Sequence, residues 1–402
     1  MKINTGKGYI TLSALVAIWS ISAITSLPGL AISPILGDMN TIFPKASDLE
    51  IQMLTSLPSL LIIPFVLVAG FLSAKRSKLP LLVAGLLIFF LSGVACLVAK
   101  SMTSLIIASC TLGIGAGMII PLSTGLVVDY FTGERRVNQL GYSSAINNLT
   151  LVFATALTGY VADIDWHLSF LVYLLPGISL LLIAALRNTE PAPEPKESDQ
   201  LKQSDINRTH LIALTLFYFA ITYTSLVITF DLSFLFERYH ITQSLSGVVI
   251  SVFFLAIMLP GVMLNRIIRI SRSMTNILSL AAMCVGLLLI SLFHNAAWSF
   301  VGAVLLGFGY GIMQPLIYDK AAIIAPPHLA TKALSVVMAA NYFAIILCPF
   351  IIDAFRRLFG NHSETFPFML NAVIAGLMCL VAIVGRKNFV LGLDKSYYDQ
   401  RA

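Results

Sequence analysis

The 402-residue sequence predicts an all-α membrane protein of twelve transmembrane helices, arranged as two related six-helix halves. Three observations support this fold class. Hydrophobic residues make up 58% of the chain and charged residues only 11%, which lies outside the usual range of soluble domains. Apolar stretches of about 18 to 25 residues recur along the chain, each long enough to cross a bilayer as a helix. A pattern of glycine and proline also returns once, 194 residues later.

The apolar stretches divide six and six around one polar segment. The predicted spans cover residues 8–34, 50–73, 79–99, 103–129, 138–162 and 168–186, and then 209–235, 243–265, 274–293, 297–318, 333–353 and 366–385. The segment between the two sets is charged and rich in proline, so it cannot bury an apolar core and should form an extended linker. The predicted domains are an N-terminal bundle (1–186), the linker (187–210), a C-terminal bundle (211–386) and a tail (387–402).

Lysine and arginine residues are distributed unevenly between the predicted spans. If the N-terminus is cytoplasmic, the outer segments hold only Lys45, Lys100, Arg238, Arg356 and Arg357, which leaves 25 − 5 = 20 basic residues in inner segments. An excess of lysine and arginine is typical of cytoplasmic segments. We therefore expect a multi-pass protein of the plasma (inner) membrane with both termini cytoplasmic. Anionic lipid accounts for the net charge of +6, and no nucleic-acid partner is expected.

The fourth span of each half has nearly the same sequence. Residues 112–122 read LGIGAGMIIPL and residues 306–316 read LGFGYGIMQPL, so six of eleven positions are identical. The same offset of 194 residues carries Asn147 onto Asn341. Parallel repeats of this kind are the architecture on which alternating access by rocking of two bundles is built.

The repeated residues have a defined physical effect on helices. Gly113 and Gly117, and the matching pair that ends at Gly311, have the small-xxx-small spacing that lets helix backbones approach closely. Pro121 and Pro315 each remove a backbone hydrogen bond within a span and should bend it. Such a bend serves either static packing or a gating hinge, and its presence in both halves favours gating.

A basic connection joins the second and third spans of each half. These connections, GFLSAKRSK at 70–78 and GVMLNRIIR at 261–269, resemble the signature loop of the major facilitator superfamily, Gly-x-Leu-Ala-Asp-Arg-x-Gly-Arg-Lys. The first copy keeps the initial glycine, the leucine and the positive charge, but Ala74 replaces the acid and Ser77 the second glycine. The positions that carry the resemblance are Gly70, Leu72, Lys75, Arg76 and Lys78, and in the second copy Gly261, Asn265, Arg266 and Arg269.

The resemblance covers the whole chain in topology. The fourth span and the loop after it, with Asp129 and Arg135, also resemble the corresponding part of the superfamily. Membership would imply a secondary transporter in which the signature loop helps to stabilise one conformation through charge contacts. The antiporter signature of the fifth helix is not found in residues 147–163, where only Gly159 and nearby small residues are similar to it. The direction of transport therefore stays open.

Polar uncharged side chains within the spans are candidates for a substrate cavity. The resemblance places them on helices that line the central cavity of the superfamily. They are Trp19, Ser22, Asn147, Asn148, Tyr218, Tyr223, Tyr310, Gln314, Asn341 and Tyr342. For each of them, hydrogen bonding between helices is the alternative. No lysine or arginine falls within a predicted span, so such a pocket suits neutral, cationic or lipophilic molecules better than phosphate esters or polycarboxylates.

Two aspartates are candidates for proton coupling, because an ionisable side chain inside a membrane is costly and usually functional. Asp231 lies about twenty residues into the seventh span. Its alternative is a solvated position at the outer membrane boundary near Glu237 and Arg238. Asp319 lies at the inner end of the tenth span, where the alternative is a local ion pair with Lys320.

The expected function is proton-coupled export of small lipophilic or amphipathic compounds, that is, efflux by antiport. The rival is an uptake permease, a symporter or uniporter for a small organic solute.

An enzyme would need clustered acids, histidines or a nucleophile within the spans, and the histidines lie in loops or at span ends. We therefore expect no enzymatic activity, cofactor or metal. A receptor would usually carry a folded soluble domain. The expected partners of this monomer are a small-molecule substrate, protons and membrane lipid.

Overall fold

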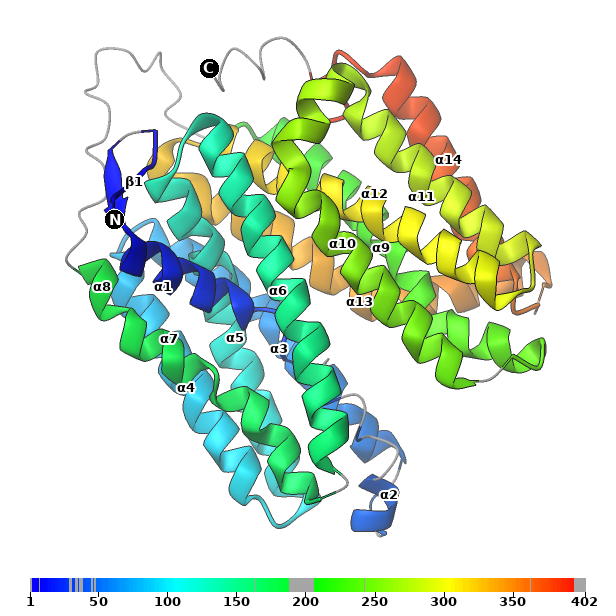
Figure 1. Ribbon diagram of the computed structural model, residues 1–402, viewed down its shortest axis with the longest axis horizontal. Coiled ribbons are helices and arrows are strands. Elements are labelled where there is room, and N and C mark those ends of the chain that lie inside the picture. The colour runs from blue at the N-terminus through cyan, green and yellow to red at the C-terminus, as the bar shows by residue number, and fades with distance from the viewer. Residues whose placement is uncertain are drawn as a thin grey trace. The chain divides into compact units, whose positions relative to one another are not determined.

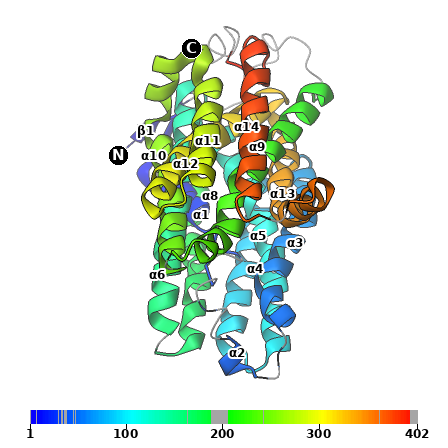
Figure 2. The same ribbon diagram turned by 90° about the vertical axis from the view of Figure 1, so that its right-hand side faces the viewer.

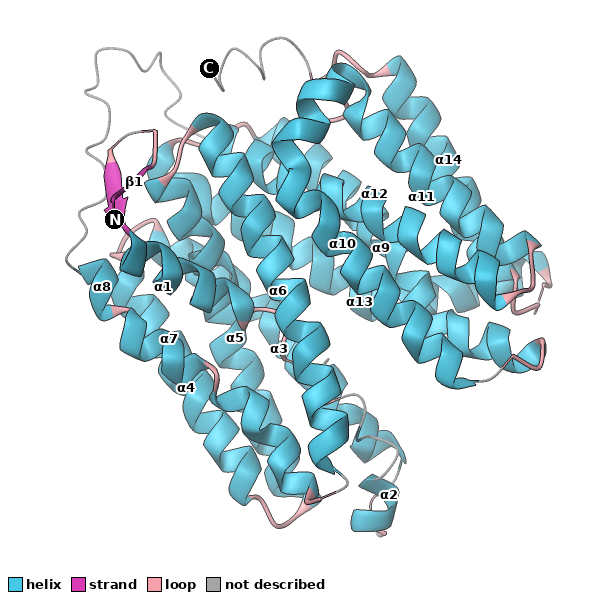
Figure 3. Ribbon diagram, viewed as in Figure 1, coloured by secondary structure: helices cyan, strands magenta, loops and turns pink. Residues whose placement is uncertain are grey.

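The structure is a computed structural model that describes residues 2–6, 8–28, 31–32, 35, 39–44, 46, 48–162, 164–187, 206–241, 243–361 and 363–393. Helices make up nearly all of the described chain, and the N-terminal hairpin is its pair of strands (Figure 3). Most of the predicted linker and residues 394–402 of the predicted tail lie outside the described residues.

The helices follow the order of the predicted spans (Figure 1). The first half contains α1 (Leu12–Ala23), α2 (Met39–Ile42), α3 (Asp48–Ser73), α4 (Lys78–Val98), α5 (Met102–Tyr130), α6 (Gly133–Ala162), η2 (Trp166–Leu174), α7 (Pro176–Leu182) and α8 (Ala184–Arg187). The second half contains α9 (Arg208–Arg238), α10 (Gln243–Ser271), η3 (Arg272–Met274), α11 (Thr275–Leu292), α12 (Ala296–Ile323), η4 (Pro327–Leu329), α13 (Ala330–Phe359) and α14 (Phe366–Val384).

The helices have the length and composition of membrane spans. Eight stretches of the described chain are long and apolar enough to cross a bilayer, and one of them, Leu245–Leu292, covers most of α10 and all of α11. The helix α1 and the stretch Trp166–Leu182 are apolar but shorter. Many large apolar side chains on these helices are exposed, as Leu91, Leu181 and Val384 are, which is expected where lipid rather than water is the solvent. The chain is an all-α membrane protein with the twelve-span order of the sequence prediction.

The first predicted span, 8–34, is wrong at both ends. Strand β2 (Tyr9–Thr11) pairs antiparallel with β1 (Lys2–Asn4). Helix α1 then starts where the Thr11 hydroxyl accepts a hydrogen bond from the amide of Ala14 at 3.2 Å, a normal N-cap. It ends at Ala23, where Pro28 cannot donate a hydrogen bond to the Ile24 carbonyl and its ring would clash with that carbonyl in a continued helix. The apolar character of the segment continues past the point where the helix stops.

Other predicted boundaries also move. The predicted span at 168–186 is divided into η2, α7 and α8, with Pro176 at the start of α7. Proline has no amide hydrogen to continue the preceding helix, but its fixed backbone angle suits the first turn of the next one. By contrast, α13 extends from Ala330 to Phe359, beyond the predicted 333–353. This extension places Arg356 within a helix rather than in a loop.

The contacts between Cα atoms divide the chain into two compact units. Unit 1 comprises Met1–Thr132, Ile146–Ile206 and Ala322–Tyr342, and unit 2 comprises Gly133–Ala145, Asn207–Ala321 and Phe343–Ala402. Within unit 1, α4 packs against both α5 and α7 (Figure 1). Within unit 2, α11 and α14 lie side by side, and α14 also contacts α9 (Figures 1 and 2).

Candidate functional site

A buried cluster of polar aromatic side chains joins α9 to α12 in unit 2. The hydroxyl of Tyr218 lies 2.9 Å from that of Tyr318 and 3.4 Å from that of Tyr310. The Gln314 side-chain amide donates to the same Tyr218 oxygen at 3.2 Å. The Tyr218 side chain is fully buried, and a buried phenol oxygen needs such partners because water cannot reach it. Tyr218 is therefore the centre of the cluster, and we call these four residues the tyrosine cluster.

The positions in α12 explain how the tyrosine cluster forms. Tyr310, Gln314 and Tyr318 are spaced four residues apart, which places them on one face of a helix. The Ser144 hydroxyl of α6 donates to the Gln314 carbonyl oxygen at 2.9 Å. The sequence prediction included Tyr218, Tyr310 and Gln314 but missed Tyr318 and Ser144. The four-residue spacing after Gln314 was the signal that could have found Tyr318.

Three further residues of the predicted cavity lie on α9 and α13. Tyr223 is buried on α9, and its hydroxyl has no hydrogen-bond partner among the described residues. Its main-chain carbonyl accepts a long contact of 3.9 Å from the thiol of Cys348. Asn341 and Tyr342 are half-buried on α13, in the part of that helix that belongs to unit 1.

Asn147, in unit 1, stabilises the end of the first helix. Its side-chain oxygen accepts from the amide of Ser26 at 3.0 Å, and its side-chain nitrogen donates to the Ser26 hydroxyl at 2.6 Å. Because α1 stops at Ala23, the amide of Ser26 has no helical partner and Asn147 supplies one. The contact joins α6 to the turn after α1, and a cavity role for Asn147 stays a prediction.

The remaining candidates of unit 1 lie close to the same helices. The Ser22 hydroxyl is 3.2 Å from that of Ser123 on α5 and also donates to the Ile18 carbonyl. Trp19 is half-buried on α1, and Asn148 is buried on α6. Ser22 and Ser123 therefore link α1 to α5 by a hydrogen bond between two small side chains.

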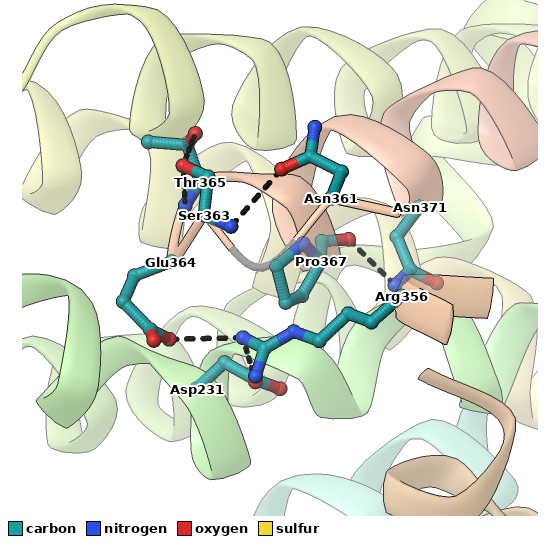
Figure 4. A network of polar contacts seen from close by, with 8 residues as sticks. All are labelled: Asp231, Arg356, Asn361, Ser363, Glu364, Thr365, Pro367 and Asn371. Carbon is teal, nitrogen blue, oxygen red and sulfur yellow. Dashed lines mark hydrogen bonds and ion pairs between the residues drawn. The ribbon is translucent and has the colours of Figure 1, made fainter. Parts of the chain in front are cut away.

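Asp231 lies in a network of charges in unit 2, and its side chain is largely buried (Figure 4). One of its oxygens is 3.7 Å from Nη2 of Arg356 on α13. The same nitrogen donates to Glu364 at 2.9 Å, so a single guanidinium lies between two carboxylates. Nε of Arg356 is buried without a hydrogen-bond partner in the described chain. Asp231 is therefore neither isolated in the span nor a freely solvated end residue.

The sequence predicted a role for Asp231 but did not identify Arg356 as its partner. Arg356 was assigned to an outer loop, so Asp231 was compared with Glu237 and Arg238 instead. The longer α13 places Arg356 within reach of Asp231. Two carboxylates that share one cation are not equally neutralised, and the more distant of the two, Asp231, gains less from the pair. Loss or gain of a proton on Asp231 would change how Arg356 divides its contacts between the two acids.

Asp319 and Lys320 have separate partners. Asp319 is fully buried, and its Oδ1 is 2.6 Å from Nε of Arg136 in the first turn of α6. Lys320 is also buried and donates to the main-chain carbonyls of Val390 and Gly392, each at 2.8 Å. Successive helical residues point about 100° apart, which explains why these neighbours reach different elements. Lys320 lies just beyond the predicted tenth span, 297–318, but the apolar helix continues past it to Ile323.

The first copy of the signature loop forms an ion pair in unit 1. Nζ of Lys78, at the start of α4, lies 2.6 Å from both carboxylate oxygens of Asp129 near the end of α5. Lys75 and Arg76, the basic residues chosen from the sequence, are exposed. Gly70 faces Ser335 of α13, and a Cβ at Gly70 would collide with the serine side chain. The loop therefore combines one charge contact with one close helix contact.

The second copy has the same combination in unit 2. The Asn265 side chain donates to the main-chain carbonyl of Glu134 at 3.1 Å, and Arg269 pairs with the Glu134 carboxylate at 2.5 Å. A Cβ at Gly261 would lie 2.5 Å from the carbonyl oxygen of Gly141 on α6. Arg266 is exposed, as is Arg135 beside Glu134. Glu134 at the start of α6 is thus the acid that the second loop contacts.

The glycines of the repeated pattern lie at close helix contacts in both halves. A Cβ at Gly113 or Gly117 would meet the backbone of α3 near Pro58 and Ile62. A Cβ at Gly311 would meet the backbone of α10 at Ile257. The predicted close approach is therefore observed. Pro121 and Pro315 are interior to α5 and α12, and a gating role for them stays a prediction.

Comparisons with known proteins agree with this arrangement. The structure is similar to the proton:xylose symporter XylE, with a TM-score of 0.73 and 13% identity over 95% of this chain and 96% of that one. It is also similar to the human organic anion transporter MFSD10 (TETRAN), with a TM-score of 0.69 and 15% identity over 92% of this chain and 97% of that one. At these identities the similarity concerns the fold.

Two curated bacterial proteins are similar in sequence. The multidrug transporter protein MdtP of Bacillus subtilis (strain 168) is 30% identical over 161 residues, which are 40% of this chain and 29% of MdtP. The quinolone resistance protein NorA of Staphylococcus aureus (strain Mu50 / ATCC 700699) is 25% identical over 190 residues, which are 47% of this chain and 46% of NorA. The matched region therefore spans less than half of either relative.

The family assignment depends on a longer match. The family model described as Major Facilitator Superfamily matches residues 10–349, which include both copies of the signature loop and both glycine-proline helices. The helix order and the solved neighbours agree with that match. The chain belongs to the major facilitator superfamily, a family of membrane transporters and not of enzymes.

Proposed function

We propose that this transporter exports small lipophilic or amphipathic compounds from the cytoplasm in exchange for protons. The two bundles at 1–186 and 211–386 would alternate in exposing the substrate to each side of the membrane, joined by the linker at 187–210. The names of MdtP and NorA, a multidrug transporter and a quinolone resistance protein, support export of such compounds. The similarity to XylE extends to the fold alone and does not favour uptake.

The observation that carries this proposal is the charge network of Asp231. A largely buried carboxylate 3.7 Å from an arginine that also binds Glu364 can exist in two states. When Asp231 is ionised, Arg356 is shared between two acids. When Asp231 is protonated, it no longer attracts Arg356 as an anion, and Glu364 is the charged partner that remains in the described chain. Protonation from one side and release to the other would therefore change the contacts between α9 and α13, as antiport requires.

The tyrosine cluster supports the proposed class of cargo. Gln314 and Tyr318 are half-buried, whereas Tyr218 and Tyr310 are buried, and a pocket that reached this aromatic and hydroxyl-bearing cluster would suit apolar molecules with few polar groups. Aromatic faces also attract cations. Of the other sequence candidates, Tyr223 has a buried hydroxyl with no hydrogen-bond partner in the described part of the chain, which a ligand group could satisfy. The proposed substrates are neutral or cationic aromatic compounds.

The distribution of basic residues supports the proposed orientation. With 20 of the 25 lysine and arginine residues in inner segments, both termini would lie in the cytoplasm of a cell whose plasma membrane holds the protein. In that orientation Asp231 is near the outer surface, and Asp319, Asp129 and Glu134 are near the inner one. The proton would then enter from outside at Asp231, and the protein would act as a monomer in contact with lipid.

The experiment that tests direction measures the fluorescence of ethidium, a lipophilic aromatic cation, in energised cells. Cells that express the wild-type protein should hold less ethidium than cells with an empty vector, and an uncoupler that abolishes the proton gradient should remove the difference. The Asp353→Asn variant is a matched control, because Asp353 is an exposed acid on α13 that pairs with Arg357. Greater accumulation in expressing cells would contradict export and favour the uptake permease.

A further inference from the structure

The chain after α14 folds back onto unit 2. We call residues Gly385–Leu393 the C-terminal strap. It forms a series of turns in which the amide of Asn388 donates to the Gly385 carbonyl at 2.7 Å and the amide of Gly392 donates to the Asn388 carbonyl at 2.8 Å. Two of its side chains, Val390 and Leu393, are buried. The C-terminal strap is therefore packed against the protein.

Two buried polar side chains bind the backbone of the C-terminal strap. Lys320 of α12 donates to the carbonyls of Val390 and Gly392 at 2.8 Å each, and Asn276 of α11 donates to the Leu391 carbonyl at 2.8 Å. The three carbonyls that follow one another along the chain are thus all bound by side chains. The ring of Phe389 also lies 5.8 Å from the Lys320 ammonium, within range of a cation–π interaction.

The strap also stabilises Lys320, because it supplies acceptors for the buried ammonium group. Its side chain is 1% exposed, and the two strap carbonyls are the hydrogen-bond acceptors that the structure gives it. A buried ammonium that loses its acceptors is strongly unfavourable. If the strap leaves, Lys320 loses both acceptors, which favours a rearrangement of its side chain and of the end of α12.

That movement would affect the ion pair beside it. Asp319 precedes Lys320 and binds Arg136 in the first turn of α6. Glu134, two residues before Arg136 on α6, binds Arg269 of α10. One dipeptide of α12 therefore connects the C-terminal strap to the contacts that fix the start of α6. Lys320, which binds the strap, is therefore next in the sequence to Asp319, which forms the buried ion pair with Arg136.

We propose that the C-terminal strap stabilises one conformation of the protein. When the strap binds Lys320, it holds α12 in the position in which Asp319 pairs with Arg136. Undocking of the strap weakens that pair and releases the start of α6. The strap thereby sets the stability of the conformation in which α6, α10 and α12 are held together. The inference extends the proposed function, since that conformation is one state of the transport cycle.

Hydrogen–deuterium exchange of the purified full-length protein tests this coupling without any substrate. The test variant is Lys320→Met, which keeps a similar length but cannot donate a hydrogen bond. The matched control is Lys387→Met, which removes an exposed lysine of the strap itself. We expect exchange in Lys320→Met to rise by about tenfold in peptides that cover 385–393 and to rise also in 133–145, with no change in Lys387→Met.

A second variant covers the case in which Lys320→Met does not fold. Asn276→Ala removes only the contact to Leu391, and we expect it to raise exchange in the same two regions by a smaller factor. Unchanged exchange at 385–393 in a folded variant would contradict the proposal that Lys320 and Asn276 hold the strap in place. Faster exchange confined to 385–393, with 133–145 unaffected, would overturn its coupling to the ion pair. Because no cargo is present, neither outcome depends on whether the protein exports drugs.

Discussion

Arg136 and Asp319 form a buried ion pair that joins the first turn of α6 to α12. Nε of Arg136 lies 2.6 Å from Oδ1 of Asp319, and the side chains are 13% and 0% exposed. The residues are 183 positions apart in the sequence. Removing one partner of such a pair leaves a buried charge without compensation, which typically costs about 3–5 kcal/mol.

We therefore predict that Arg136→Ala and Asp319→Ala each lower the thermal unfolding temperature of the detergent-purified protein substantially. The double variant should be less destabilised than the sum of the two single variants, because it leaves neither charge unpaired. The control pair is Arg357 and Asp353, whose side chains are 77% and 55% exposed and whose removal should change stability by less than about 1 kcal/mol. Similar shifts for both pairs would contradict a buried role for Asp319.

The glycine contact between α6 and α10 gives a second prediction. A Cβ at Gly261 would lie 2.5 Å from the Gly141 carbonyl oxygen, so Gly261→Ala must push the helices apart. We expect lower stability and reduced transport. Gly247→Ala on the same helix meets nothing within 4 Å and should be neutral or stabilising, since alanine is the better helix former by about 1 kcal/mol. Equal unfolding temperatures for the two variants would refute this.

The tyrosine cluster predicts an effect on both stability and binding. Tyr218→Phe removes the oxygen that contacts Tyr310, Tyr318 and Gln314, at a cost of about 1–2 kcal/mol. Ethidium binding, followed by fluorescence titration of the purified protein, should weaken. Tyr160→Phe is the control, because Tyr160 is 73% exposed. Unaltered affinity in Tyr218→Phe would remove the cluster from the proposed binding surface.

The first signature loop should depend on Lys78 and not on its more exposed neighbour. Lys78→Met deletes the contact to Asp129, whereas Lys75→Met deletes an exposed charge at the same loop. The pair is partly exposed, so we expect a modest loss of stability of about 1 kcal/mol together with slower transport. The comparison uses the initial rate of ethidium efflux at matched expression. If Lys75→Met slows efflux as much as Lys78→Met does, the pair with Asp129 has no special role.

Much of the fold could be predicted because hydropathy and the repeated glycine-proline pattern can be recognised within short stretches of the sequence. The order of the spans and the close contacts at Gly113, Gly117 and Gly311 follow from residues that are near one another in the sequence. The end of α1 could not be read from hydropathy, since the segment stays apolar after Ala23 while Pro28 stops the helix. The signal was present as a proline, but apolar length outweighed it.

The polar contacts were harder to predict, because each joins residues far apart in the chain. Lys78 and Asp129 are 51 positions apart, and the partner of Asp231 was placed in a loop. Asp319 and Lys320 are neighbours in sequence, yet the helix turns them toward α6 and the C-terminal strap. Side-chain pairing depends on helix rotation, which the span boundaries alone do not determine.

The most direct test of proton coupling uses the purified protein in liposomes that contain a pH-sensitive dye. Addition of ethidium should change the internal pH with the wild-type protein and with Asp353→Asn. The Asp231→Asn variant should still move ethidium down its gradient but produce no change in internal pH. A proton movement in Asp231→Asn equal to that of the wild type would contradict the assignment of Asp231 as the coupling residue.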